Sequence, residues 1–411
     1  MSFRSVFISI FIGTSLILAA FILHQRRPPQ EADQPSPQFV QATGKCAECH
    51  LKETSAVVHQ YERSEHARAN VTCFDCHRAA EGQQEKEHDG FLLAVQLTSL
   101  NCQRCHTTEY AQYARSRHAL PAWAAIKGTE GMSAEMIAFG ESYHAGAVDR
   151  AANALGLREG AAATQAGCLG CHGIGTPNQD GSIGTCTDCH SRHSTSIALA
   201  REPQTCGQCH MGPDHAQIEI YNESKHGVLY QAQKRQMNLT AEPKRLSTRD
   251  MPVPTCATCH MSGLEGLKVT HDLTERLSYW LFAAVSKKRP GYQQGQTQMK
   301  EVCLKCHASP SVERFYAEAE TVLATTNEKV EEGQRIIAAL RQEGLLTPAP
   351  FDEPIEFVAF DFWHYYGRTA KHGAFMGGAD FVQWHGNYEL LAKLTELEEM
   401  AAALRRQHEG E

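Results

Sequence analysis

Residues 168–172 of the chain read Cys-Leu-Gly-Cys-His, residues 186–190 read Cys-Thr-Asp-Cys-His, and residues 206–210 read Cys-Gly-Gln-Cys-His. These are three of eight copies of one pattern, Cys-x-x-Cys-His, which together use all 16 cysteines. Two cysteines in this spacing can form thioether bonds to the vinyl groups of one haem, and the histidine that follows can bind its iron. A zinc half-site or a thioredoxin-like dithiol requires no histidine at the next position. Because histidine makes up only 22 of 411 residues, the pattern predicts eight covalently bound haem c groups and no disulfide.

The residues predicted to bind the cofactors follow from the eight copies. The thioether cysteines are Cys46, Cys49, Cys73, Cys76, Cys102, Cys105, Cys168, Cys171, Cys186, Cys189, Cys206, Cys209, Cys256, Cys259, Cys303 and Cys306. The proximal iron ligands are His50, His77, His106, His172, His190, His210, His260 and His307.

The composition indicates a fold built around these groups. Apolar residues make up 42% of the chain and aromatic residues 8%, so a core of side chains alone would be thin. No alternating strand pattern persists, and long helical patterns cover residues 312–343, 354–370 and 380–407. We therefore predict a mainly α protein, a multihaem cytochrome c fold wrapped around eight haems, with a C-terminal bundle of long helices. The net charge of −8 argues against nucleic acid and is compatible with a cationic electron-transfer partner.

The N-terminus predicts a membrane segment. An apolar run from Val6 to Leu23 is followed by Arg26 and Arg27, and this favours an uncleaved anchor over a cleaved signal peptide. Covalent haem attachment takes place outside the cytoplasmic membrane, so we expect a periplasmic protein anchored by this helix, although the flanking charges favour the opposite orientation. The expected organisation is an anchor or signal peptide over 1–27, a polar proline-rich tether over 28–44, an octahaem-binding domain over 45–310 and a C-terminal helical domain over 311–411.

A second repeat, Tyr-x-x-Ser-x-His, occurs at residues 61–66, 113–118 and 221–226. Each closing histidine lies 12 to 16 residues beyond a proximal histidine, an excursion long enough to return a second imidazole to an iron. The alternative is a surface histidine beside a charged residue. Three matched occurrences favour distal ligation by His66, His118 and His226.

The remaining histidines suffice for a second ligand at every haem, or at all but one. A fully ligated set would only conduct electrons, whereas one open iron would be a reaction centre. The adjacent Asp214 and His215, behind a Gly-Pro turn, form a plausible proton-handling pair. In the alternative interpretation His215 is an iron ligand and Asp214 a surface charge.

The chain resembles the octahaem hydroxylamine oxidoreductase family, which is related to the pentahaem nitrite reductases. The resemblance is carried by residues 186–193, 206–215, 219–227, 256–260, 269–272, 372–375 and 384–389. It implies that the fourth motif holds a catalytic haem with an open distal side, and that Asp214 and His215 are catalytic. The family site also has a distal tyrosine, for which Tyr316 is the candidate.

For the other haems the resemblance implies two histidine ligands each. The distal ligands it implies are His66, His118, His144, His193, His226, His271 and one of His372 or His385. It also implies a homotrimer that exchanges electrons with a cytochrome c or a quinone-linked protein.

The direction of the reaction stays open. Oxidising members of the family attach a tyrosine of a neighbouring subunit to the catalytic haem, and members without it resemble reductases. Here the corresponding segment carries Phe375 and Phe381, while Tyr365, Tyr366 and Tyr388 lie nearby. We therefore expect redox conversion of a small nitrogenous substrate, either oxidation of hydroxylamine or reduction of nitrite or hydroxylamine. The alternative is a membrane-tethered electron conduit without substrate chemistry.

Overall fold

The computed structural model describes residues 37–410. Contacts within the chain divide it into two compact units, one ending at Cys73 and the other beginning at Phe74. The described part of the first unit is helical, with α2 (Pro37–Glu53), α3 (Ser55–Glu62) and α4 (Glu65–Arg68). Gly44 breaks α2 at a left-handed φ of 66°, just before the first Cys-x-x-Cys-His motif.

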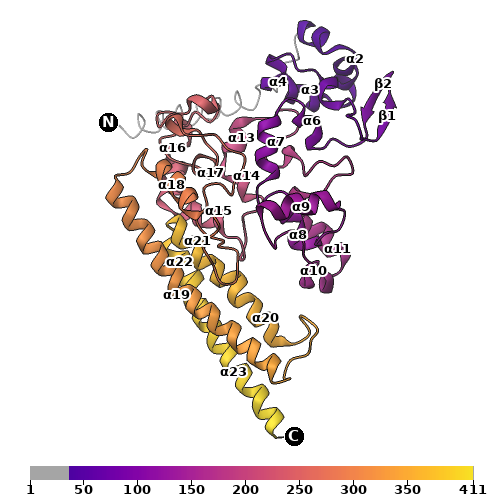
Figure 1. Ribbon diagram of the computed structural model, residues 1–411. Helices are drawn as coiled ribbons and strands as arrows, with labels where there is room; N and C mark the ends of the chain where they lie inside the picture. Colours follow the sequence, from indigo (N-terminus) through magenta and orange to yellow (C-terminus); the bar gives the residue numbers. More distant parts are fainter. Residues whose placement is uncertain (1–36, 411) are drawn as a thin grey trace, which may run out of the picture. The chain divides into compact units, whose positions relative to one another are not determined.

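The second unit begins with short helices around one hairpin (Figure 1). Strands β1 (Glu85–His88) and β2 (Phe91–Ala94) pair antiparallel across Asp89 and Gly90, both of which have positive φ. This is the two-residue loop geometry that Asp-Gly favours. The helices of this part are α5 (Cys73–His77), α6 (Ser99–Gln103), α7 (Thr107–Ala114), α8 (Leu120–Lys127), α9 (Ala134–Tyr143), α10 (Ala154–Glu159), α11 (Ala161–Ala163) and α12 (Leu169–His172).

The central part of the second unit carries motifs four to eight on short helices and turns. Its helices are α13 (Ile197–Arg201), α14 (Pro203–Gly207), α15 (Gln217–Glu223), α16 (Lys225–Gln233), α17 (Cys256–His260) and α18 (Tyr292–Cys303). The apolar clusters between them are small; one consists of Leu246, Met251, Leu264 and Val302. Side chains alone therefore provide little core here, as the composition predicted.

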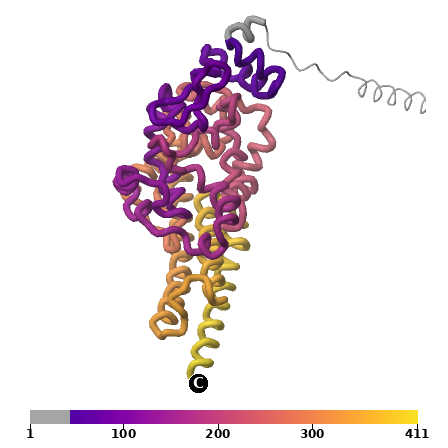
Figure 2. The backbone as a smooth tube through the Cα atoms, turned by 90° about the vertical axis from the view of Figure 1, so that its right-hand side faces the viewer, coloured from indigo at the N-terminus to yellow at the C-terminus, as the bar shows by residue number. Residues whose placement is uncertain are grey.

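The C-terminal part is a bundle of longer helices. Its elements are α19 (Ser309–Gln342), α20 (Pro354–Asp361), the π-helix η7 (Phe362–Gly367), α21 (Arg368–Met376), α22 (Ala379–Val382), the π-helix η8 (Gln383–Tyr388) and α23 (Glu389–Glu409). Helices α19 and α23 run side by side (Figure 2) around a core that includes Val330, Phe362 and Leu390. Gly333 permits η7 to pack closely on α19, because a Cβ there would lie 2.4 Å from the Phe362 ring.

The prediction of a mainly α fold with long C-terminal helices is confirmed, with two details changed. The helical run expected over residues 354–370 is divided into α20, η7 and the start of α21, and the run expected over residues 380–407 is divided into α22, η8 and α23. The π-helix η7 therefore introduces a wide turn where an uninterrupted α-helix was expected.

The expected membrane-anchored, periplasmic localisation is not upheld. Within residues 37–410 no helix is long and apolar enough to cross a membrane. The apolar run from Val6 to Leu23, on which the expectation rested, lies outside the residues that the structure describes. The anchor and the localisation are therefore withdrawn.

Candidate functional site

Four proximal histidines lie opposite a second histidine. The ring-centroid distances are 6.4 Å for His77 with His193, 6.4 Å for His190 with His271, 5.7 Å for His210 with His118 and 5.9 Å for His307 with His226. Imidazoles that bind opposite sides of one iron face each other in this way. The structure thus pairs four of the predicted proximal histidines with four of the predicted distal histidines.

The Tyr-x-x-Ser-x-His repeat has a structural cause that sequence reasoning missed. In each copy the backbone N–H of the serine donates to the tyrosine carbonyl, which ends one helix. Ser64 and Ser224 then cap the next helix by accepting from the N–H three residues later. The histidine two residues after the serine lies in the first turn of that helix or just after the break. The repeat is therefore a helix break that redirects a histidine.

The tyrosines of the repeat hold the break in place. The hydroxyl of Tyr221 donates to the carbonyl of Pro254 at 2.9 Å, and that of Tyr113 donates to the carbonyls of Ile174 and His118. The serines are buried, with Ser64, Ser116 and Ser224 at most 4% exposed. These buried hydroxyl contacts leave little freedom to the histidine that follows.

Other expected distal ligands occupy different surroundings. His144 is buried, its Nε2 lies 2.7 Å from the carbonyl of Arg115, and its ring contacts Trp280. His372 is buried against the Phe282 ring, at a centroid distance of 4.8 Å. His385 is instead exposed and pairs with Asp380 at 3.0 Å. Burial therefore favours His372 over His385 as an internal ligand. The remaining predicted ligand, His66, lies in α4 of the first unit.

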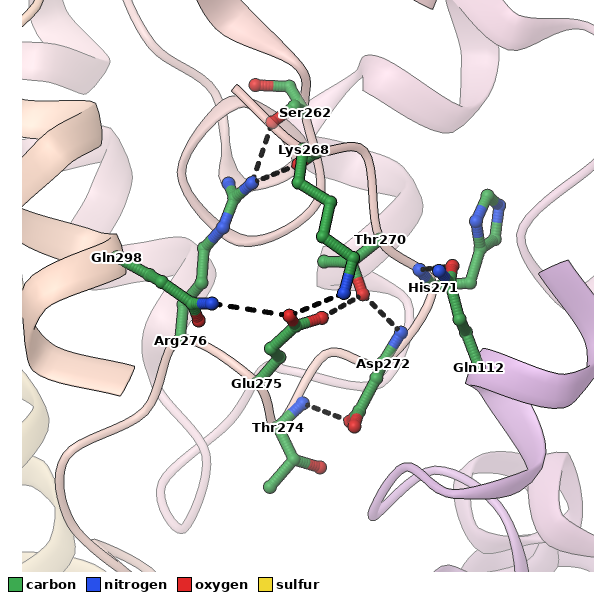
Figure 3. Close-up of polar contacts among 10 residues, drawn as sticks. All are labelled: Gln112, Ser262, Lys268, Thr270, His271, Asp272, Thr274, Glu275, Arg276 and Gln298. Atoms are coloured by element: carbon green, nitrogen blue, oxygen red, sulfur yellow. Dashed lines mark hydrogen bonds and ion pairs between the residues drawn. The ribbon is translucent and has the colours of Figure 1, made fainter. Parts of the chain in front are cut away.

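A polar network holds the loop that carries His271 (Figure 3). Arg276 donates to the carbonyls of Cys259, Ser262 and Lys268 at 2.6 to 2.8 Å and so fixes the end of the seventh motif. The side-chain carbonyl of Gln112 accepts from the backbone N–H of His271 at 2.9 Å, which ties this loop to α7. The histidine is thus positioned by its backbone rather than by its ring.

The attachment cysteines of different motifs approach one another. Side chains are hydrogen-bonding neighbours in the pairs Cys102 with Cys186, Cys171 with Cys209, and Cys206 with Cys256. Burial raises the pKa of three further thiols, and the charge of a cysteine in another motif raises each pKa further. Cys102 acts in this way on Cys76, Cys206 on Cys189, and Cys303 on Cys259. Motifs two, three, five, six, seven and eight therefore form a series, which the fourth motif joins at the sixth.

The fourth motif presents its histidine in a defined orientation. His172 lies at the end of α12, and its Nδ1 donates to the carbonyl of Ala122 in α8 at 2.8 Å. The Nε2 atom is therefore the free, unprotonated nitrogen. Burial lowers the pKa of His172, so the ring is neutral, as a metal ligand must be.

The charges of Asp214 and His215 act on the pKa of His172, and the ring of His215 lies 6.4 Å from that of His210, the proximal histidine of the sixth motif. The Asp214 carboxylate accepts a hydrogen bond from Nδ1 of His215. Burial raises the pKa of Asp214, but the hydrogen bond from His215 and the nearby positive groups outweigh it, so the pKa is lowered. The turn before the pair requires Gly212, which has a φ of +84°. Asp214 and His215 thus form a hydrogen-bonded pair whose charges reach the fourth motif, and their catalytic role stays a prediction.

Two further residues of this site were not recognised from the sequence. His364 of η7 lies 6.3 Å from the His215 ring, and burial lowers its pKa to about 3. Arg368, one position beyond η7, is 9% exposed, and burial lowers its pKa to about 10. Their spacing of four residues, which brings side chains to one helix face, was the available signal. It is common in helices and therefore weak.

Tyr316 lies outside this cluster. Its ring contacts Phe315 and Phe375, with the Lys300 ammonium 4.8 Å from the ring centroid. Burial raises its pKa, and so do the charges of Cys303 and Cys259 of the eighth and seventh motifs. Tyr365 is the tyrosine closer to Asp214. Burial raises the pKa of Tyr365, and the charge of Asp214 raises it further.

The residues present fit covalently bound haem. None of the 16 cysteines, all of which lie within the described residues, forms a disulfide, and four histidine pairs face each other as described above. A cavity of about 580 Å³ adjoins the second and third motifs and is lined in part by Arg78 and Arg104. The Nε of Arg104 is buried without a hydrogen-bond partner, as expected where a carboxylate such as a haem propionate would bind.

Known proteins agree with this geometry. The chain is 26% identical over 357 residues to a probable nitrite reductase-hydroxylamine oxidoreductase fusion protein of Kuenenia stuttgartiensis, covering 75% of this chain but 39% of the relative. A hypothetical multihaem protein shares the fold with a TM-score of 0.76 at 22% identity, over 92% of this chain and 98% of its own. The reducing HAO-like protein complex of Kuenenia stuttgartiensis matches with a TM-score of 0.67 at 20% identity, over 88% and 85% of the two chains.

The model of one protein family matches most of the chain. It describes a multihaem cytochrome with Cys-x-x-Cys-His units and covers residues 69–354, a range that contains seven of the eight units. Together with the opposed histidines and the absence of disulfides among these cysteines, this match establishes that the chain belongs to the multihaem c-type cytochromes and binds haem covalently through these units.

Proposed function

We propose that this cytochrome binds eight haem c groups and is an oxidoreductase acting on a small nitrogenous substrate, nitrite or hydroxylamine, at the fourth motif. One observation carries the proposal: Asp214 and His215 form a hydrogen-bonded pair whose charges act on His172, the proximal histidine of that motif. The names of the relatives, a probable nitrite reductase-hydroxylamine oxidoreductase fusion protein and a reducing HAO-like complex, support the substrate class.

The protein's own residues would manage protons at this site. When bound, the haem supplies an iron that takes up a small ligand and exchanges electrons. Asp214 accepts a hydrogen bond from Nδ1–H of His215, which leaves Nε2 of His215 to receive a proton or, once protonated, to give one. Loss of oxygen from nitrite as water consumes protons, and oxidation of hydroxylamine releases them. Either direction needs such a pair.

We propose that the other motifs carry electrons. The distal ligands proposed are those expected above, with His372 preferred to His385 because it is buried. The interaction between the thiols of Cys171 and Cys209 supports a fourth haem next to the sixth. Electrons would therefore enter or leave through the sixth haem, with branches toward the third and fifth motifs on one side and the seventh and eighth on the other.

The partners proposed are a cytochrome c or a quinone-linked protein and two further copies of this chain. Trp384, Tyr388 and Leu391 support self-association, because they follow one another at helical spacing and are 53 to 59% exposed. Light scattering on the purified haem protein should give the mass of three chains, and the mass of one chain would contradict the trimer.

Two measurements on the purified protein test the proposed function. The intact mass under denaturing conditions should equal the chain plus eight haems, without a link between chains. Turnover should be detected in at least one direction, with nitrite and a reduced dye or with hydroxylamine and an electron acceptor. A protein that exchanges electrons with dyes but turns over neither substrate would be an electron conduit without substrate chemistry.

A further inference from the structure

The buried guanidinium of Arg368 has no ionic partner in the part of the chain that the structure describes. It donates one hydrogen bond, from Nε to the carbonyl of Phe282 at 3.0 Å. Its Cζ lies 5.5 Å from the centroid of the Phe282 ring and 4.9 Å from that of Trp363. The group is thus held by two aromatic faces and one carbonyl, while its two terminal nitrogens make no hydrogen bond to a described residue. A guanidinium held in this way is preorganised to bind a further acceptor.

The acceptor is not Asp214, although its charge acts on Arg368. The Asp214 carboxylate is engaged by Nδ1 of His215, and no ion pair joins it to Arg368 among residues 37–410. A second buried basic group, Lys371, donates to the carbonyls of Ala283 and Ala284 at 3.1 and 2.7 Å, and burial lowers its pKa to about 7. The carboxylate of the cluster is thus engaged by His215, and the guanidinium of Arg368 is left without a direct anionic partner among the described residues.

We propose that Arg368 makes the site of the fourth motif selective for a small oxyanion, nitrite, over neutral hydroxylamine. The two oxygens of nitrite match the parallel N–H groups of a guanidinium, and a hydrogen bond between ions is stronger than one to a neutral group. Hydroxylamine offers neither the charge nor the two matched acceptors. The inference rests on the proposed function, since it assigns a substrate to that same site, and it favours the reductive direction.

The test compares two ligands in matched variants of the haem-loaded protein. Equilibrium binding of nitrite and of hydroxylamine is measured by the change in haem absorbance, for the natural protein, Arg368→Gln and Arg368→Lys. The control is Arg201→Gln, because Arg201 is also buried and donates to two backbone carbonyls, those of Leu239 and Ala241. All variants are first matched for haem content.

Arg368→Gln should weaken nitrite binding by roughly 10-fold to 100-fold, the usual effect of losing a hydrogen bond to a charged group. Hydroxylamine binding should change by less than about 3-fold, and Arg201→Gln should leave the ratio of the two affinities unchanged. An equal loss for both ligands would overturn the proposal, because Arg368 would then support only the fold or the haem. Unchanged nitrite binding would overturn it as well.

Three other outcomes distinguish the role of Arg368 from the proposed function. If Arg368→Gln fails to load haem, Arg368→Lys decides: it keeps the charge but loses the fork, so a selective loss of nitrite affinity supports the proposal and an equal loss contradicts it. If the natural protein binds neither ligand, the proposed function itself fails, and the assignment to Arg368 falls with it. Binding of both ligands with an unchanged ratio in the variants overturns only the role of Arg368.

Discussion

Replacing Asp214 by asparagine removes the charge next to His215 and keeps the shape of the side chain. In the structure the carboxylate accepts a hydrogen bond from Nδ1 of His215, so Nε2 is the ring nitrogen that would exchange a proton with a substrate in the proposed function. An asparagine can still accept that hydrogen bond, so the pair should persist. It no longer stabilises a proton on His215, and the proton transfer should slow.

The expected magnitude follows from the role and the exposure of the pair. Positioned acid–base groups contribute roughly 100-fold to 10,000-fold to a rate, so turnover should fall at least about 100-fold. The side chains of Asp214 and His215 are 28% and 21% exposed, so the loss of their ion pair should cost only about 1 kcal/mol of stability. Activity and folding are therefore separable in this variant.

The assay is steady-state turnover at matched haem content, with Asp149→Asn as a control at an exposed position. The lowered pKa of Asp214 means that its contribution to stability is present above its ordinary value of 3.8 and is lost as the pH falls through the lower folded value. Its titration should therefore not appear in a pH profile recorded above about pH 5. Turnover of Asp214→Asn within about 3-fold of the natural protein would refute the assigned role.

Two further predictions concern the scaffold. Ser224→Ala removes the cap that accepts from Gly227 N–H at 3.2 Å, so denaturant unfolding should show a loss of about 0.5–2 kcal/mol, whereas an unchanged midpoint would exclude the helix-break interpretation of the repeat. Arg276→Gln removes the donor shared by three carbonyls, so stability should fall by on the order of 3 kcal/mol, and a variant as stable as the natural protein would show that the carbonyls find other partners.

The sequence allowed the cofactor and the kind of fold to be predicted, because covalent haem attachment requires adjacent residues. The Cys-x-x-Cys-His units are local, so their chemistry is visible without any tertiary contact. The pairing of His210 with His118 could be predicted only in part, because the repeat identified His118 as a distal ligand but not the iron that it faces. Pairing depends on where distant turns meet, as it does for His271 and His190.

The residues around the fourth motif show the same limit of prediction from the sequence. Asp214 and His215 are adjacent in sequence and were recognised, whereas His364 and Arg368 come from the π-helix η7 and the first residue of α21, about 150 residues away. Tyr316 was chosen for its place after the eighth motif, but α19 directs it toward Phe375 and Lys300. A residue that reaches a site only through tertiary contacts has little in its local sequence that would predict its role.

Whether the fourth motif differs from the other seven is tested most directly by the spin state of the oxidised protein. Electron paramagnetic resonance of the resting haem protein should show one high-spin haem beside a low-spin majority, because only the fourth iron is proposed to lack a second histidine. Nitrite should convert that signal and leave the others unchanged. A wholly low-spin spectrum, unaffected by nitrite or hydroxylamine, would contradict a reaction centre beside Asp214 and His215.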